Sequence, residues 1–192
     1  MNWDVVNWDH EAATFDDEPD HGLRDPSVRA AWAARLAAWL PPAPADVFDA
    51  GCGTGSLTLL AAELGHRPVG VDRSAEMVGR ARRKLAGAGF TPEITVGDAD
   101  DPPGHFDAVL CRHLLWIFDD PAAVLRRWIA SLRPGGRLVL VEGRWGTAGI
   151  TAGELAGMVR PMVGRVVVEP LPDPALWGRP VHDERYAVVA LP

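Results

Sequence analysis

Three glycines at alternate positions, Gly51, Gly53 and Gly55, directly follow a short apolar run that begins at Val47. Glycine accepts positive φ angles and lets another group approach the main chain without a Cβ in the way. A helical pattern of leucines and alanines starts at Ser56, so the glycines lie in a strand-to-helix turn. This composition favours a ligand that lies against the backbone; a tight connection without a ligand is the alternative.

The charges around this turn narrow the choice of ligand. No Lys or Arg lies between Asp46 and Glu63, and the Lys-Ser or Lys-Thr pair of a phosphate-binding loop is absent. Ser56 stands where the dinucleotide fingerprint needs its third glycine. Asp49 precedes the turn, and Asp72 ends the next apolar run, where doubly wound folds place a carboxylate that binds ribose hydroxyls. Carboxylates without a phosphate site favour a positively charged adenosyl ligand such as S-adenosylmethionine.

Five motifs follow one another in a set order along the chain. They are VFDAGCGTG at 47–55, VGVDRSAEM at 69–77, GDA at 97–99, FDAVL at 106–110 and LRPGGRLVL at 132–140. In this order they resemble the class I S-adenosylmethionine-dependent methyltransferases over about residues 45–145. The resemblance implies an α/β fold with a doubly wound, Rossmann-like sheet of seven strands. That sheet would be mostly parallel with one antiparallel strand, and helices would cover both faces.

The resemblance also implies where the cofactor binds. Arg73 and Met77 would flank the adenine; packing of Met77 in the core is the alternative. Asp98 and the main-chain N–H of Ala99 would bind the adenine edge, and the backbone near Cys111 would lie against the methionine amine. We expect Asp49, Asp72 and Asp98 to meet in one cleft. The full set of cofactor candidates is Asp49, Gly51, Cys52, Gly53, Gly55, Asp72, Arg73, Met77, Asp98, Ala99 and Cys111.

The segment after the strand predicted at 106–111 carries the catalytic candidate. The resemblance places His113 and Trp116 near the transferred methyl group. His113 has a titration range suited to a general base, and a structural histidine is the alternative. A base is needed only if the acceptor is a protonated hydroxyl or amine. The substrate-binding candidates are Trp3, Trp8, Phe15, His21, Trp116 and Trp145.

Residues 1–24 are acidic, with scattered aromatic side chains, and are too polar to form a core of their own. We predict that they form a lid over the site; a frayed tail is the alternative. Residues 25–192 are predicted to form a single methyltransferase domain. No long insertion follows Trp145, where substrate-recognition elements commonly occur in this family, so we expect a small acceptor or a site completed by a second subunit.

The composition excludes several classes of partner. The net charge of −7 disfavours a nucleic-acid substrate. The six histidines show no metal-ligand spacing, so no metal is expected. No signal peptide or membrane-spanning run is evident, so we expect a cytoplasmic monomer or homodimer.

The sequence therefore predicts a methyltransferase that moves a methyl group from S-adenosylmethionine directly to an oxygen or nitrogen nucleophile of a small molecule. A non-catalytic S-adenosylmethionine-binding or regulatory protein on the same fold is the first alternative. A nicotinamide-dependent oxidoreductase is the second.

Overall fold

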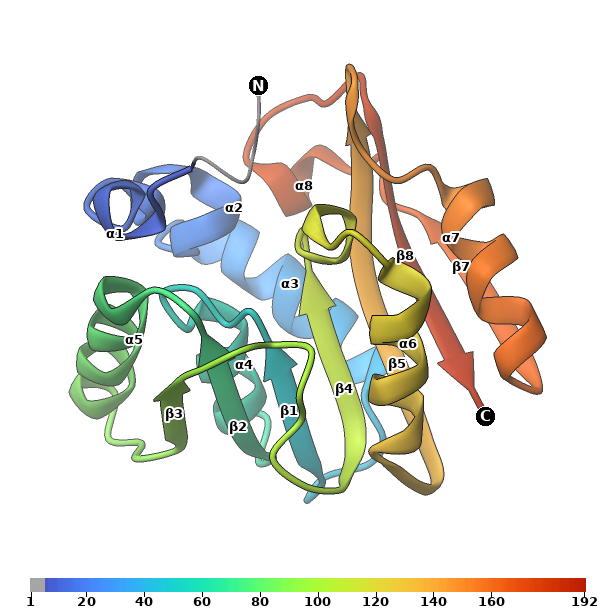
Figure 1. Ribbon diagram of the computed structural model, residues 1–192. Helices are drawn as coiled ribbons and strands as arrows, with labels where there is room; N and C mark the ends of the chain where they lie inside the picture. Colours follow the sequence, from blue (N-terminus) through green and yellow to red (C-terminus); the bar gives the residue numbers. More distant parts are fainter. Residues whose placement is uncertain (1–5) are drawn as a thin grey trace.

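The computed structural model describes residues 6–192, so the predicted substrate residue Trp3 lies outside the described part of the chain. One sheet forms its centre, in the strand order β3-β2-β1-β4-β5-β8-β7 (Figure 1). The short strand β6 pairs with β5 off this path. The strands are β1 (Asp46–Ala50), β2 (Arg67–Asp72), β3 (Glu93–Val96), β4 (Phe106–Arg112), β5 (Leu132–Trp145), β6 (Ala148–Gly149), β7 (Arg165–Pro170) and β8 (Glu184–Leu191).

The directions of the strands confirm the predicted doubly wound fold. β1 pairs in parallel with β2 and β4, while the outer pairs β2–β3 and β4–β5 are parallel as well. Strand β8 is antiparallel to both of its neighbours, β5 and β7. The seven-strand path thus has one antiparallel strand, as predicted, and the two-residue β6 is an addition that the sequence did not reveal.

Helices cover both faces of the sheet because the strands are apolar on both sides. Phe48 of β1 belongs to the core cluster with α6 and α7, whereas its neighbour Val47 packs with α3, α4 and α8. Trp32 and Trp39 of α3 are buried in this second cluster, as predicted. The helices are α3 (Pro26–Trp39), α4 (Ser56–Glu63), α5 (Ala75–Gly87), α6 (Pro121–Ala130), α7 (Ala152–Val159) and α8 (Pro174–Trp177), with the 3₁₀ turns η3 (Leu115–Ile117) and η4 (Arg160–Met162).

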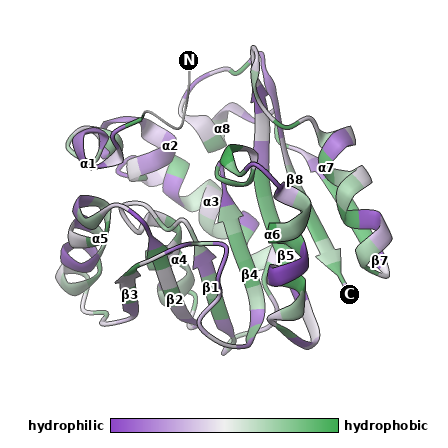
Figure 2. Ribbon diagram, viewed as in Figure 1, coloured by the Kyte–Doolittle hydropathy of each residue, from purple (hydrophilic) through white to green (hydrophobic). Residues whose placement is uncertain are grey.

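Three short helices precede this domain and lie near the carboxyl ends of its strands, above α5 in Figure 1. They are α1 (Trp8–Glu11), the 3₁₀ turn η2 (Phe15–Asp17) and α2 (Pro19–Gly22), which together we call the N-terminal cover (residues 8–22). Figure 2 shows hydrophilic residues in α1, in contrast with the mostly green strands β4 and β5 in the centre of the domain. Polar contacts therefore have to hold the cover on the domain.

Candidate active site

The predicted turn between β1 and α4 has the conformation that its glycines allow. Gly51, Gly53 and Gly55 have φ angles of 69°, 54° and 77°. The amides of Gly51 and Cys52 donate to the carbonyl of Val71 at 2.9 and 3.0 Å, which fixes the turn to the end of β2. A Cβ at Gly55 would lie 2.9 Å from the Cβ of Ala81, so this glycine lets α5 pack closely.

Two of the three predicted acids lie together beside this turn. Asp49 is buried and accepts a hydrogen bond from the Thr58 hydroxyl at 2.5 Å. Asp72 accepts from the amides of Gly53 and Ser74, each at 2.9 Å. Burial, together with the charge of Asp72, raises the pKa of Asp49 to about 6. Burial also raises the pKa of Asp72. Two carboxylates removed from water in this way favour a cationic ligand.

The third predicted acid lies at the surface. The side chain of Asp98 is 66% exposed and forms an ion pair with Arg73 at 3.2 Å. Its neighbour Ala99 is buried, and the carbonyl of Ala99 accepts a hydrogen bond from the Trp128 indole at 2.8 Å. The structure thus joins Arg73 to Asp98 and leaves Asp98 outside the pair formed by Asp49 and Asp72.

Three further cofactor candidates have buried side chains. The Cys52 side chain packs against Gly70 of β2: a Cβ added to Gly70 would lie 3.0 Å from the Cys52 sulfur. Met77 is 2% exposed in the first turn of α5, and Cys111 is fully buried in β4. Burial raises the pKa of both thiols, so neither is an activated nucleophile. Cys52 and Cys111 can contribute to a binding site only through their main chain.

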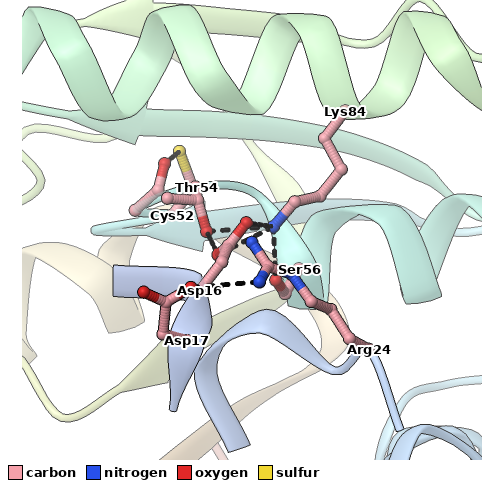
Figure 3. A network of polar contacts seen from close by, with 8 residues as sticks. Asp16, Asp17, Arg24, Cys52, Thr54, Ser56 and Lys84 are labelled. Carbon is pink, nitrogen blue, oxygen red and sulfur yellow. Dashed lines mark hydrogen bonds and ion pairs between the residues drawn. The ribbon is translucent and has the colours of Figure 1, made fainter. Parts of the chain in front are cut away.

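The N-terminal cover reaches the glycine turn through Phe15 and Asp16. The Phe15 ring lies 3.6 Å from the position that a Cβ on Gly53 would take, and it stacks on His21 with ring centres 4.3 Å apart. The Thr54 hydroxyl donates to Asp16 at 2.5 Å, and the Lys84 ammonium lies 2.9 Å from the same carboxylate (Figure 3).

A second set of contacts joins the cover to α5 and β4. The hydroxyl of Ser74 donates to Asp9 at 2.5 Å, one residue after the half-buried candidate Trp8. The guanidinium of Arg112 donates to the main-chain carbonyl of Asp20 at 2.6 Å. The cover is therefore attached at both sides of the glycine turn.

His113 occupies the position after β4 in a strained backbone conformation, with a φ of 56°. Its amide donates to the Val141 carbonyl at 2.9 Å, and its own carbonyl accepts from the Trp116 indole at 3.2 Å. The ring meets Trp145 edge-on at 4.8 Å and stacks on Trp177 at 6.0 Å. Its Nε2 atom is out of reach of solvent and has no hydrogen-bond partner among the described residues.

The electrostatic surroundings keep the His113 imidazole neutral. Burial holds its pKa well below the usual range, and the positive charges of Arg112 and Arg185 lower it further. Arg185 lies over the rings of Trp145 and Trp177, at 5.0 and 4.8 Å from their centres. The same guanidinium binds both carboxylate oxygens of Asp183 at 2.9 and 3.0 Å.

Sequence reasoning predicted Trp116 and Trp145 near His113 but missed Arg185, Trp177 and the nearby Glu142. Arg185 and Trp177 come from the C-terminal part of the chain, and no local pattern connects them to β4. Glu142 is fully buried in β5 and accepts from the amides of Leu114 and Leu115 at 3.0 and 2.8 Å. Burial raises the pKa of Glu142 to about 8. A glutamate within an apolar strand was the one available signal for this residue.

A cavity of about 560 Å³ opens at the amino ends of the parallel strands, opposite to the glycine turn. Its lining includes Asp46, Arg67 and Arg133, and both arginines form ion pairs with Asp46. In doubly wound sheets ligands bind beyond the carboxyl ends of the strands. The candidate site is therefore the glycine turn with the residues around His113, not this cavity.

The sequence motifs match a known family. A profile described as "Methyltransferase domain" matches residues 48–140, from β1 into β5. A ubiquinone biosynthesis O-methyltransferase of Xanthomonas axonopodis pv. citri is 37% identical over 109 residues, which cover 55% of this chain and 46% of the relative. The protein of the same name from Xanthomonas campestris pv. campestris is 38% identical over 112 residues, covering 56% and 45%. Residues 48–140 therefore belong to this methyltransferase family, in agreement with the resemblance to the class I S-adenosylmethionine-dependent methyltransferases.

Solved methyltransferase structures share the fold of this family member. The N-methyltransferase NodS from Bradyrhizobium japonicum WM9, in complex with S-adenosylhomocysteine, aligns with a TM-score of 0.73 at 19% identity, over 97% of this chain and all (100%) of NodS. Magnesium protoporphyrin IX methyltransferase from Synechocystis PCC 6803, with bound S-adenosylmethionine, aligns with a TM-score of 0.66 at 20% identity, over 97% and 85%. At these identities the likeness concerns the fold.

Two further findings concern the extent of the match to the relatives and the length of the helices. It spans about half the length of the curated relatives that it matches. Within residues 6–192, none of the helices combines the length and the apolar character needed to cross a bilayer.

Proposed function

We propose that this protein transfers a methyl group from S-adenosylmethionine to an oxygen or nitrogen nucleophile of a small molecule, by direct in-line transfer. One observation carries the proposal: the buried carboxylates of Asp49 and Asp72 lie beside a turn of three glycines with positive φ angles. The family membership supports the same activity.

The residues at the turn fit this cofactor. Each oxygen of Asp72 accepts one backbone amide, so each retains a lone pair for a ribose hydroxyl. Asp49 is the proposed partner for the positive charge of the methionine end. When bound, the cofactor supplies a methyl group already activated by a sulfonium. The protein has to orient the acceptor in line with the methyl–sulfur bond and exclude water.

The aromatic residues around His113 are the proposed acceptor side. The ring centres of Trp116 and Trp145 lie 6.0 Å apart beside the His113 ring. His21 of the cover, which stacks on Phe15, has a ring nitrogen within 4.8 Å of one on His113. Apolar walls favour the reaction because the positive charge of the sulfonium disappears as the methyl group moves. We propose that His113 activates a protonated acceptor, and that Trp8, together with Trp3, contributes to closure of the cover.

The names of the curated relatives favour an oxygen nucleophile on a small molecule as the first class to test. The net charge of −7 supports a small acceptor rather than a nucleic acid. We also propose a cytoplasmic location and a monomeric or homodimeric state.

Calorimetric titration with S-adenosylmethionine, S-adenosylhomocysteine and NAD tests the cofactor. We expect binding of the two adenosyl ligands and none of NAD. A screen of phenols, carboxylates and amines, read out as release of S-adenosylhomocysteine, then tests the transfer. Binding without release for every acceptor would favour the non-catalytic alternative, and binding of NAD alone would overturn the proposal.

The role of His113 is tested with His113→Asn, because asparagine accepts a positive φ and alanine would add backbone strain. We expect kcat to fall by about 100-fold or more, the range of acid–base contributions, with cofactor affinity unchanged. His105→Asn, at an exposed position in a loop, is the matched control. Turnover of the His113 variant within about threefold of the parent at saturating acceptor would refute the role.

A further inference from the structure

Three potential ligands from two distant segments meet next to the proposed acceptor side. Asp20 and His21 belong to α2 in the N-terminal cover, and His113 follows β4. One ligand atom of each residue lies within 4.8 Å of the ligand atoms of the other two. The Oδ2 atom of Asp20 is 3.6 Å from Nε2 of His21. The spacing of the histidines along the sequence gives no sign of this cluster.

Two buried nitrogen atoms in the cluster lack a partner. Nε2 of His113 and Nδ1 of His21 are both out of reach of solvent without a hydrogen bond to any described residue. The side chain of Asp20 is 7% exposed. Unpaired buried polar atoms are rare in folded proteins because each costs about 1–3 kcal/mol. An unpaired buried nitrogen on each histidine, in a group that also holds a buried carboxylate, therefore indicates that a bound species completes the group.

The three residues are held in place from both sides. Arg112 donates to the main-chain carbonyl of Asp20, which leaves the carboxylate of Asp20 available and ties α2 to the end of β4. The ring of His21 stacks on Phe15, and the ring of His113 is placed between Trp145 and Trp177. The cluster therefore exists only while the cover lies on the domain.

The donor set indicates which species fits. Two imidazoles and one carboxylate suit divalent transition metals, whereas Mg²⁺ and Ca²⁺ prefer oxygen ligands throughout. The positive charges of Arg112 and Arg185 near His113 repel any cation that is held by electrostatic attraction alone. A cation at this position therefore has to form strong coordinate bonds to the imidazole nitrogens, as transition metals do. With metal–ligand distances of about 2.0–2.2 Å, ligand atoms of a tetrahedral site lie roughly 3.5 Å apart. The observed cluster needs a contraction of roughly 1 Å to reach that geometry.

We propose that Asp20, His21 and His113 form a binding site for a divalent transition-metal cation, assembled when the N-terminal cover closes on the domain. This departs from the expectation of no metal that the sequence gives. The inference deepens the proposed function and rests on it in one respect: the cation would hold the oxygen or nitrogen of the acceptor, and His113 would act through the cation. Binding of the cation itself requires no methyl transfer.

The test uses the full chain, without a histidine tag and treated with a chelator. Co²⁺ is titrated and followed by its visible absorption, and Zn²⁺ is then added in competition. We expect one Co²⁺ per chain with the spectrum of a nitrogen-ligated site, displacement by Zn²⁺, and no displacement by a hundredfold excess of Mg²⁺. His21→Ala and Asp20→Asn should each weaken Co²⁺ binding at least tenfold, whereas His105→Ala, at an exposed site, should leave it unchanged.

His21→Ala and Asp20→Asn are the main variants because they change only the cover, and thermal unfolding checks that the domain stays folded. Absence of Co²⁺ binding below millimolar concentration, or equal binding by the parent, His21→Ala and Asp20→Asn, would overturn the inference. A water molecule bound between the histidines would give the first of these results. Titration with S-adenosylhomocysteine in the same samples separates the two proposals: cofactor binding without Co²⁺ rejects only the metal site, and the reverse rejects only the proposed function.

Discussion

The two sides of the candidate site are built in opposite ways. The cofactor side uses one short stretch, residues 49–58, together with the end of β2, and its hydrogen bonds go largely to backbone amides. The acceptor side draws its side chains from the cover, the end of β4, β5 and the C-terminal part of the chain. Backbone recognition needs a local motif, whereas recognition by side chains needs the whole fold to be in place.

This difference implies different sensitivities to substitution. On the cofactor side, the effect of a change should depend on whether the residue holds the glycine turn. On the acceptor side, it should depend on whether distant segments stay together. The following predictions test each side against a neighbouring residue that lacks the contact.

The largest effect is expected from Asp72→Asn. The substitution removes the charge that accepts from Gly53 and Ser74 and that we assign to the ribose. Hydrogen bonds to a charged group contribute about 1.5–3 kcal/mol, so affinity for S-adenosylhomocysteine should fall by about 10- to 100-fold in calorimetry. Asp98→Asn is the matched control, since Asp98 is exposed and pairs with Arg73. Equal losses in both variants would show that Asp98 belongs to the cofactor side after all.

The next effect concerns the attachment of the cover. Asp16→Asn removes the charge that joins Thr54 and Lys84 to η2. We expect the cover to open more easily by about 1–2 kcal/mol, seen as roughly tenfold faster hydrogen exchange over residues 8–22. Asp17→Asn alters the next residue, whose exposed carboxylate pairs with Arg24, and should change exchange by less than about 0.5 kcal/mol. Identical exchange in the two variants would mean that the Asp16 network does not hold the cover.

The smallest effect, a dependence of stability on pH, is expected from Glu142→Gln. Because burial raises the folded-state pKa of Glu142 from 4.5 to about 8, the unfolded chain releases this proton at lower pH than the folded protein, and stability falls as pH rises from 4.5 to 8. Glutamine keeps an oxygen for the amides of Leu114 and Leu115 and carries no charge. At pH 8 we expect the variant to melt about 2–4 °C above the parent, which corresponds to roughly 1 kcal/mol.

At pH 4.5 the two proteins should unfold at nearly the same temperature, because Glu142 is then protonated in the parent as well. A difference that stays constant between pH 4.5 and 8 would show that packing, and not ionisation of Glu142, separates them. Differential scanning calorimetry across this range makes the comparison.

The sequence was sufficient to predict the doubly wound sheet with its one antiparallel strand because the motif strands end in features that local chemistry explains. Gly51 to Gly55 and Asp72 are examples, since the turn and the carboxylate lie next to one another in any doubly wound fold. Asp98 shows the limit of such reasoning. Its position after β3 is as the family resemblance implies, yet Arg73 forms an ion pair with it at the surface.

The surroundings of His113 could not be predicted. Arg185 reaches it through the pairing of β8 with β5, Trp177 reaches it from α8, and His21 reaches it through the cover. These contacts depend on how separate segments pack, and no periodicity or spacing in the chain encodes them. Trp116 and Trp145 were predicted because they lie near the carboxyl ends of strands that the motifs had already placed, Trp116 in the turn after β4 and Trp145 as the last residue of β5.

The direction of β8 has a consequence for how the site depends on the sheet. Arg185 pairs with Gly143 at the start of β8 and contacts Trp145 and Trp177, while Tyr186 points to the other face and donates to the Ile150 carbonyl at 2.9 Å. A shift of one residue would exchange the two faces, placing a guanidinium in the core and a phenol beside His113. The register of the β7–β8 hairpin therefore determines that a charged side chain lies next to His113. The hydrogen bond of the Tyr186 hydroxyl stabilises that register.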